Sequence, residues 1–415
     1  MVAKLDKSQV DRIVQSCLDL YSELPKTGKP VEGEWTVMSC LVQYDIVSGG
    51  HEVVSLGSGS KCVGAGALSA AGDRLNDSHA EVVARRALLL YLLDNVKKAI
   101  DNKPSVFRLE TNRFILDENI QFIFYSSQLP CGDASIVSKD GEEEFFGDLV
   151  QSLKRHAGDD VCRAESKRAK EADIHRTGAK CLPELLQDPK LPGAQYHLLG
   201  QVRTKPGRGD RTLSVSCSDK MARWVHMGVQ GALLDLLCGP IFISHFIFGA
   251  GVPYSEESLK RAMLERFTDC PVMCSNPPQF YQSTLTFPYK KSESNLRPAA
   301  GSVIWSKVNE TPEVAVQGRK LGLTKKKAGL RAHSLSVSKY KLYERLLNIL
   351  LSNTELRLNI LGDVCLENVP YNQMKMKSKK YYEKWMKVKE NFFKAWTVKP
   401  DIWDFCVKLD MPKPS

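Results

Sequence analysis

The feature of this sequence that most restricts its fold is an ordered alternation of strand-like and helix-like segments. Short runs rich in β-branched and aromatic residues predict strands at 35–47, 52–56, 120–125 and 241–248. Apolar residues at helical spacing predict helices at 6–24, 78–100, 218–237 and 256–267. Chains that alternate in this way cover a sheet with helices, so the expected fold class is α/β.

A long segment interrupts this alternation. Residues 138–211 are rich in charge, contain several prolines and glycines, and show weak periodicity, which predicts a surface insertion with short helical pieces. Further strands are expected at 303–305 and 314–316, and further helices at 334–352 and 374–396. Because no evident linker separates these parts, we expect a single domain over residues 1–415.

The composition is that of a globular protein with an excess of basic residues. Of its 415 residues, 43% are hydrophobic, and the formal net charge is +10, a balance that favours a polyanionic partner such as RNA. The first ten residues contain no apolar signal-peptide core, and no apolar run reaches the roughly 18 residues that span a bilayer. We therefore expect an intracellular protein, nuclear or cytoplasmic or both, without membrane association and with twelve reduced cysteines.

Three short motifs contain residue types that suit metal chemistry. They are His79-Ala80-Glu81, Pro130-Cys131 and a segment that begins Ser216-Cys217. One histidine and two thiolates can hold a catalytic zinc ion and leave a fourth position for water, whose pKa the metal lowers towards 7. A carboxylate two residues after the histidine reaches that water without binding the metal, which makes Glu81 the candidate proton carrier.

Spacing alone leaves the role of the two cysteines open. The short zinc-deaminase signature places a second cysteine three residues after the first, but Cys131 is followed at that distance by Ala134. The nearest competent third ligand is Cys217, 86 residues further on. By this criterion alone, the interpretation of these cysteines as buried thiols is favoured.

The same motifs resemble those of the adenosine deaminases acting on RNA and their tRNA-specific relatives. The shared segments are Asn76-Asp77-Ser78-His79-Ala80-Glu81 with Arg85-Arg86, Pro130-Cys131-Gly132-Asp133-Ala134, and Ser216-Cys217-Ser218-Asp219-Lys220 with Ala222-Arg223-Trp224. The resemblance covers roughly residues 35–405. It implies a cytidine-deaminase-like α/β/α sandwich with a long insertion and extra C-terminal helices. It further implies zinc held by His79, Cys131 and Cys217, with Glu81 moving protons in the hydrolytic conversion of adenosine to inosine.

Within that family the chain is most similar to the tRNA-specific branch, which deaminates the adenosine 3′ of the anticodon. The insertion segments 175–180 and 205–211 resemble that subgroup, and no duplex-RNA-binding domain is evident. The expected substrate is therefore tRNA, at adenosine 37 of tRNA-Ala. The alternatives are a deaminase of other structured or double-stranded RNA or of cytosine, a catalytically inactive RNA-binding relative, and a protein whose zinc is only structural.

A second group of basic and aromatic residues lies near the C-terminus and close to the His79 and Cys217 motifs. Read by itself, such a group is typical of a solvated or RNA-facing surface. The resemblance instead implies a buried inositol hexakisphosphate, because buried like charges need a polyanion to neutralise them. The matching residues are Lys61, Asn76, Arg85, Arg86, Lys220, Arg223, Trp224, Lys339, Tyr371, Lys375, Tyr381, Trp396, Lys399 and Asp404. The chain departs from the pattern at Val398 and Trp385, where a carboxylate and a lysine are expected.

The basic part of the insertion is the candidate surface for RNA. An adenosine must leave its stack to reach the metal, and an anticodon loop presents such bases at low cost. The predicted phosphate contacts are Arg176, Lys180, Arg203, Lys205 and Arg208, although each is equally compatible with a solvated loop. No protein partner is evident, and a monomer is expected.

Overall fold

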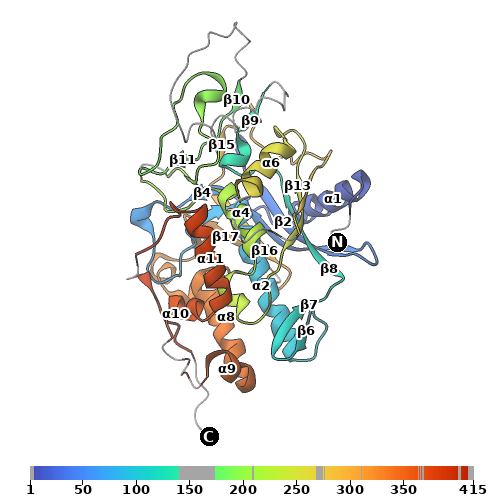
Figure 1. Cartoon of the computed structure of the whole chain (residues 1–415), viewed down its shortest axis with the longest axis vertical. Coiled ribbons are helices and arrows are strands. Elements are labelled where there is room, and N and C mark those ends of the chain that lie inside the picture. The colour runs from blue at the N-terminus through green and yellow to red at the C-terminus, as the bar shows by residue number, and fades with distance from the viewer. Residues whose placement is uncertain are drawn as a thin grey trace.

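The structure is a computed structural model that describes residues 4–139, 173–207, 210–267, 274, 276–309, 311–362, 364, 366, 369–400 and 403–409. It is a mixed α/β fold built around one large sheet (Figure 1). Part of the predicted insertion, residues 140–172, lies outside the described residues, as does Arg208.

The central sheet has eight strands in the order β14-β13-β8-β2-β3-β16-β17-β18. The four strands expected first are present as β2 (Met38–Asp45), β3 (His51–Ser58), β8 (Ile120–Ser126) and β13 (Ile243–Phe248). β13 runs parallel to β8 and to β14 (Gln279–Gln282), and the other neighbours are antiparallel. The expected strands near 303 and 314 are β16 (Gly301–Ser306) and β17 (Glu313–Val316), and β18 (Arg319–Lys320) ends the sheet.

Helices cover both faces of this sheet. Along β8, Phe122 and Phe124 point into the cluster that contains α2 (Ala80–Ile100), α4 (Cys217–Met227) and α6 (Glu256–Met263), whereas Ile123 and Tyr125 point to α1 (Lys7–Glu23). This alternation follows from the two-residue period of a strand. Each fully buried Phe side chain contributes about 1.5–3 kcal/mol through its removal from water.

Two of the predicted helices are each divided into two. The segment 218–237 forms α4 and α5 (Gly231–Asp235), because Gly228 ends α4 with a φ of 82°, a conformation that favours glycine. The segment 374–396 begins earlier and forms α10 (Tyr371–Met376) and α11 (Lys379–Asn391). α8 (Lys339–Ser352), α10 and α11 all contact α5. α8 also contacts α2, and it is followed by α9 (Thr354–Leu361).

The described part of the insertion differs from its prediction. It contains no α-helix between 173 and 207, only a 3-10 turn at Gly193–Tyr196 and the short strands β10 (Ile174–His175), β11 (Lys180–Cys181) and β12 (Arg203–Thr204). β10 pairs with β9 (Val137–Ser138). In Figure 1 this green segment lies at the end of the molecule opposite α9.

Several smaller elements surround the sheet. β4 (Ser60–Cys62) pairs with β5 (Asp77–His79), β6 (Phe107–Glu110) pairs with β7 (Arg113–Leu116), and β1 (Glu34–Trp35) pairs with β15 (Arg297–Pro298). A short helix, α7 (Lys325–Ala328), follows β18. None of the helices in the described ranges combines the length and apolar character that a membrane span requires.

Candidate active site

Three chain segments bring the predicted metal ligands together. His79 ends β5 and is the N-cap residue of α2, so Glu81 lies in the first turn of that helix. Cys131 follows β8 and is succeeded by a single 3-10 turn, Asp133–Ser135, rather than by an α-helix. Cys217 is the first residue of α4, whose N-cap Ser216 accepts a hydrogen bond from the backbone N–H of Asp219.

The spacing of the three side chains suits a tetrahedral zinc ion. The Nδ1 atom of His79 lies 3.7 Å from Sγ of Cys217 and 3.9 Å from Sγ of Cys131, and all three ligand atoms lie within 4.8 Å of one another. Zinc–ligand bonds of the usual lengths at a tetrahedral angle would separate a nitrogen from a sulfur by about 3.6 Å. The residues therefore fit a His-Cys-Cys metal group with only small adjustments.

The two cysteine segments approach closely because Gly132 has no side chain. Its φ is 110°, and a Cβ atom there would lie 2.3 Å from Oγ of Ser216. The N–H of Cys217 donates to Sγ of Cys131 at 3.4 Å, and the N–H of Ser218 donates to the carbonyl of Cys131 at 3.0 Å. A larger residue at position 132 would push the two thiols apart.

The pKa values of the two thiols are shifted in opposite directions. The hydrogen bond with Cys217, together with the nearby Lys205 and His79 charges, holds the pKa of Cys131 well below its usual range. Burial and the adjacent Cys131 thiolate raise the pKa of Cys217. Cys131 is therefore the thiol that loses its proton more readily.

Glu81 has the surroundings of a proton carrier. Its side chain is 3% exposed, and Oε2 has no hydrogen-bond partner among the residues that the structure describes. Burial raises its pKa above the ordinary glutamate value. An unpartnered buried carboxylate oxygen is costly, and a water molecule on a metal held by the neighbouring His79 would satisfy it.

Cys62, Asp77 and His79 form a second group close enough for a metal. Its carboxylate is already engaged, because Oδ2 of Asp77 accepts from Nζ of Lys205 at 2.8 Å and also forms an ion pair with Lys220. These ammonium groups hold the pKa of Asp77 well below its usual range despite burial, which acts in the opposite direction. A cation at this group would face two positive charges, so the His-Cys-Cys group is the better metal site.

Two residues that the sequence assigned to RNA contacts are buried. The Lys205 side chain is 0% exposed, and its Nζ atom donates to Asp77 and, at 3.0 Å, to Sγ of Cys217. The Arg203 side chain is equally buried and forms two hydrogen bonds of 2.6 Å with Asp188. Neither side chain can reach a phosphate, because each is satisfied by a carboxylate inside the protein.

Two other residues predicted to contact RNA lie on the protein surface. Arg176 and Lys180 are exposed. The guanidinium of Arg176 lies 4.0 Å from the ring centre of Tyr196, and its neighbour Thr177 accepts a hydrogen bond of 2.9 Å from the N–H of Gly132. The exposed Arg176 is thus adjacent to the loop that carries Cys131.

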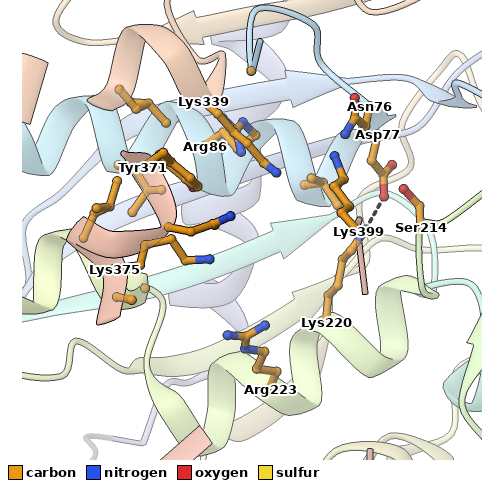
Figure 2. A pocket seen from close by; sticks show the side chains of 18 of the residues that line it. Asn76, Asp77, Arg86, Ser214, Lys220, Arg223, Lys339, Tyr371, Lys375 and Lys399 are labelled. Carbon is orange, nitrogen blue, oxygen red and sulfur yellow. Dashed lines mark hydrogen bonds and ion pairs between the residues drawn. The ribbon is translucent and has the colours of Figure 1, made fainter. Parts of the chain in front are cut away.

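A cavity lined by cations lies on the other side of Asp77 (Figure 2). It has a volume of about 650 Å³, and Figure 2 shows the amino groups of Lys339, Lys375 and Lys399 and the guanidinium of Arg223 directed into it. Of the residues predicted for the inositol phosphate, those that line the cavity are Asn76, Arg85, Arg86, Lys220, Arg223, Trp224, Lys339, Tyr371, Lys375, Tyr381, Trp396 and Lys399.

Two of the predicted residues do not line this cavity. Lys61 lies in β4, where it pairs with Ser78 of β5. Asp404 accepts hydrogen bonds from the N–H groups of Asn372 and Phe405, and so organises the backbone beside the cavity. Trp385, which departs from the expected lysine, packs its ring 3.6 Å from the guanidinium of Arg223.

The electrostatics of the cavity are those of an anion site. Burial and the nearby Arg223 lower the pKa of Lys375 to about 8, and burial with neighbouring cations lowers the pKa of Arg85 to about 10. The pKa of Lys339 is lowered well below its ordinary value by burial and by Lys399 and Lys375. A polyphosphate fits this set, since it would neutralise the repelling cations.

Comparison with known proteins decides the family. A sequence profile of the adenosine-deaminase (editase) domain matches residues 55–400. The chain belongs to this editase domain family. The tRNA-specific adenosine deaminase 1 of Drosophila melanogaster is 37% identical to the editase chain, over 96% of the chain and 97% of the relative.

Two further relatives place this editase within the family. The human tRNA-specific adenosine deaminase 1 is 31% identical over 94% of the chain and 98% of its own length. The double-stranded RNA-specific editase Adar of Drosophila melanogaster is 30% identical over 60% of the chain and 34% of its own length. The protein is therefore an enzyme that deaminates adenosine, and its similarity extends over nearly the full length of the tRNA-specific relatives.

Proposed function

We propose that this editase converts adenosine to inosine in tRNA by hydrolytic deamination, at adenosine 37 of tRNA-Ala. The observation that carries the proposal is the convergence of His79, Cys131 and Cys217 beside the unpartnered carboxylate oxygen of Glu81. Relatives of the tRNA-specific class that match almost end to end support tRNA as the substrate. The position rests on the resemblance of insertion segments 175–180 and 205–211 to the subgroup that deaminates next to the anticodon.

In this proposal His79, Cys131 and Cys217 hold a zinc ion. Zinc, when bound, supplies a Lewis acid that lowers the pKa of a water molecule towards 7. Glu81 would accept one proton as the water oxygen bonds to C6 of the adenine and pass it to the ring nitrogen; it would then accept the second proton from the new C6 hydroxyl and pass it to the amino group, so that the C6–N bond breaks and ammonia leaves. Its burial would assist each proton uptake, because a raised pKa makes the protonated carboxyl easier to form near neutral pH.

The cation-lined cavity would hold inositol hexakisphosphate. Among its cations, Lys375, Lys339 and Arg85 have lowered pKa values, and a polyanion would keep them protonated. The ion pair between Lys220 and Asp77 joins the cavity wall to Lys205, which donates to Cys217. The anion and the metal centre would therefore stabilise each other through charged side chains of this chain.

The proposal extends to the fold family and to the way in which tRNA binds. We assign the mixed sheet with helices on both faces to the cytidine-deaminase-like α/β/α sandwich. The exposed Arg176 and Lys180 would contact phosphates of the anticodon arm, and contacts of that kind position RNA without specifying sequence. The target base would enter from a loop in which it is already unpaired. We expect a monomer to be sufficient, because all the predicted ligands come from one chain.

Incubation of the purified protein with total tRNA, followed by sequencing for inosine, tests this function. We expect new inosine at position 37 of tRNA-Ala with the wild-type protein and none with Glu81→Gln. Inosine only in added duplex RNA would support the alternative editase of double-stranded substrates, and uridine in place of cytidine would support a cytosine deaminase. Zinc retained without any product would support a protein whose zinc is only structural.

A further inference from the structure

Two buried aspartates accompany the two cysteines of the candidate metal site. Asp133 lies two residues after Cys131, and Asp219 lies two residues after Cys217. Each is 1% exposed. Sequence reasoning treated both only as parts of their motifs, and neither carboxylate is used by the proposed chemistry. Buried carboxylates are costly unless they are paired and hydrogen-bonded, so their partners show what these residues do.

The partner of Asp133 is Arg261 of α6. The Nε atom of Arg261 lies 3.1 Å from Oδ2 of Asp133. Its NH2 group donates to the backbone carbonyls of Asp133 and Ile136 at 2.9 and 3.0 Å. One guanidinium thus fixes both the side chain and the backbone of the turn that follows Cys131.

The partner of Asp219 is Arg266, from the turn that follows α6. Its NH2 group lies 2.8 Å from Oδ1 of Asp219. The other carboxylate oxygen accepts a hydrogen bond of 2.6 Å from the hydroxyl of Ser216, and the N–H of Asp219 donates a hydrogen bond to that hydroxyl. These bonds enclose Cys217, which lies between Ser216 and Asp219 at the start of α4.

Both aspartates also accept hydrogen bonds from the insertion. The N–H of Gly200 donates to Oδ1 of Asp133 at 2.7 Å, and the N–H of Arg203 donates to Oδ2 of Asp219 at 3.0 Å. Each carboxylate therefore joins one cysteine segment to α6 or its following turn and to the insertion. Since both arginines come from residues 261–266, one short piece of chain holds both cysteine segments.

We propose that Arg261 and Arg266 are positioning residues that set the separation of the Cys131 and Cys217 thiols. This inference rests on the metal centre of the proposed function. Each arginine acts through an aspartate that lies two residues from a cysteine. Both guanidinium groups are planar, and that of Arg261 fixes several acceptors at once, so it holds its segment in orientation as well as in place. Outer contacts of this kind govern metal affinity.

The test compares three single variants of the full chain. Arg261→Met and Arg266→Met remove the guanidinium groups while keeping similar bulk. Arg345→Met is the control, since Arg345 of α8 also faces a carboxylate, that of Asp94 at 3.9 Å, but lies outside the cysteine segments. The readouts are zinc release to a chelator, the thiolate-to-metal absorption band after cobalt substitution, and kcat and KM for inosine formation in tRNA.

We expect zinc release about 10–100-fold faster in the two test variants, as is usual when an outer-shell partner of a metal ligand is lost. The cobalt band should shift or weaken, and kcat should fall more than KM rises. Arg345→Met should match the wild-type protein in all of these. Arg261→Lys and Arg266→Lys keep a positive charge with fewer donors, so they should fold and show intermediate zinc release.

Unchanged zinc release and cobalt spectra in the two Met variants, or in the Lys variants if the Met variants do not fold, would overturn the inference. It would also be overturned by a wild-type protein that binds no zinc. If the wild-type protein retains zinc but makes no inosine in tRNA, while the variants release zinc faster, the positioning role holds and the substrate proposal fails. Zinc release therefore tests the positioning role, and inosine formation tests the proposed function separately.

Discussion

Replacing Lys205 by methionine separates the two roles that sequence and structure give to this residue. The sequence places Lys205 in a basic segment that contacts RNA. The structure places its Nζ atom inside the protein, 2.8 Å from Asp77 and 3.0 Å from the sulfur of Cys217. Methionine has a similar length and no charge, so Lys205→Met removes the ammonium with little change in packing.

The magnitude follows from the partners that are left behind. Removing one member of a buried ion pair generally costs about 3–5 kcal/mol, because the other charge stays buried. Asp77 keeps its ion pair with Lys220, so the expected loss of unfolding free energy lies near the lower end of this range, at about 3 kcal/mol. For a chain of 415 residues the unfolding entropy scales to a fall in Tm of about 3 °C. Zinc affinity should drop about 10–100-fold, because a hydrogen bond to a thiol ligand is lost.

The assay measures thermal unfolding, zinc content after dialysis against a chelator, and tRNA affinity at several salt concentrations. The affinity for tRNA and its dependence on salt should match the wild-type protein when zinc is saturating. Lys180→Met is the matched control, because its side chain is exposed and belongs to the predicted RNA surface. That variant should weaken tRNA binding and leave zinc content and Tm unchanged.

The opposite pattern would refute this reasoning. A phosphate contact contributes about one unit to the slope of log affinity against log salt concentration. If Lys205→Met lowers that slope by about one while zinc content and Tm stay at wild-type values, Lys205 contacts RNA and the buried ion pair does not describe the working protein.

Three further predictions follow from the site and the cavity. Glu81→Gln should retain zinc and tRNA binding but form no inosine, and undiminished turnover would remove Glu81 from the mechanism. Cys217→Ala should lose zinc by elemental analysis, and full occupancy would exclude Cys217 as a ligand. The anion-free protein should gain stability as pH rises from 7 to 9, because a lysine whose folded pKa is lowered to about 8 is destabilising while it remains charged. For Lys375 this gain is about 1 kcal/mol. Inositol hexakisphosphate should abolish the gain and bind more weakly at the higher pH, and Tm measured against pH with and without it is the test.

The local pattern of residues was sufficient for most of the secondary structure. The expected strands over 120–125 and 241–248 appear as β8 and β13, because alternating burial on two faces leaves a two-residue period in the sequence. The helix over 78–100 appears as α2 (Ala80–Ile100), whose first turn places His79 and Glu81 together. The breaks at Gly228 and near Ser378 were missed, since the apolar spacing continues across each of them.

The sequence by itself determined which residue types are available for chemistry, and their motifs indicated the family. Only the tertiary structure decided which charged residues face RNA and which are buried, as Lys205 and Arg203 show. Exposure is the default expectation for a lysine or an arginine, because burying a charge is unfavourable without a partner. The partners of Lys205 and Arg203 are Asp77 and Asp188, and those of Arg261 and Arg266 are Asp133 and Asp219. Each partner comes from another segment of the chain and is brought close only by the fold. The periodicity of a local segment does not predict ion pairs with distant segments.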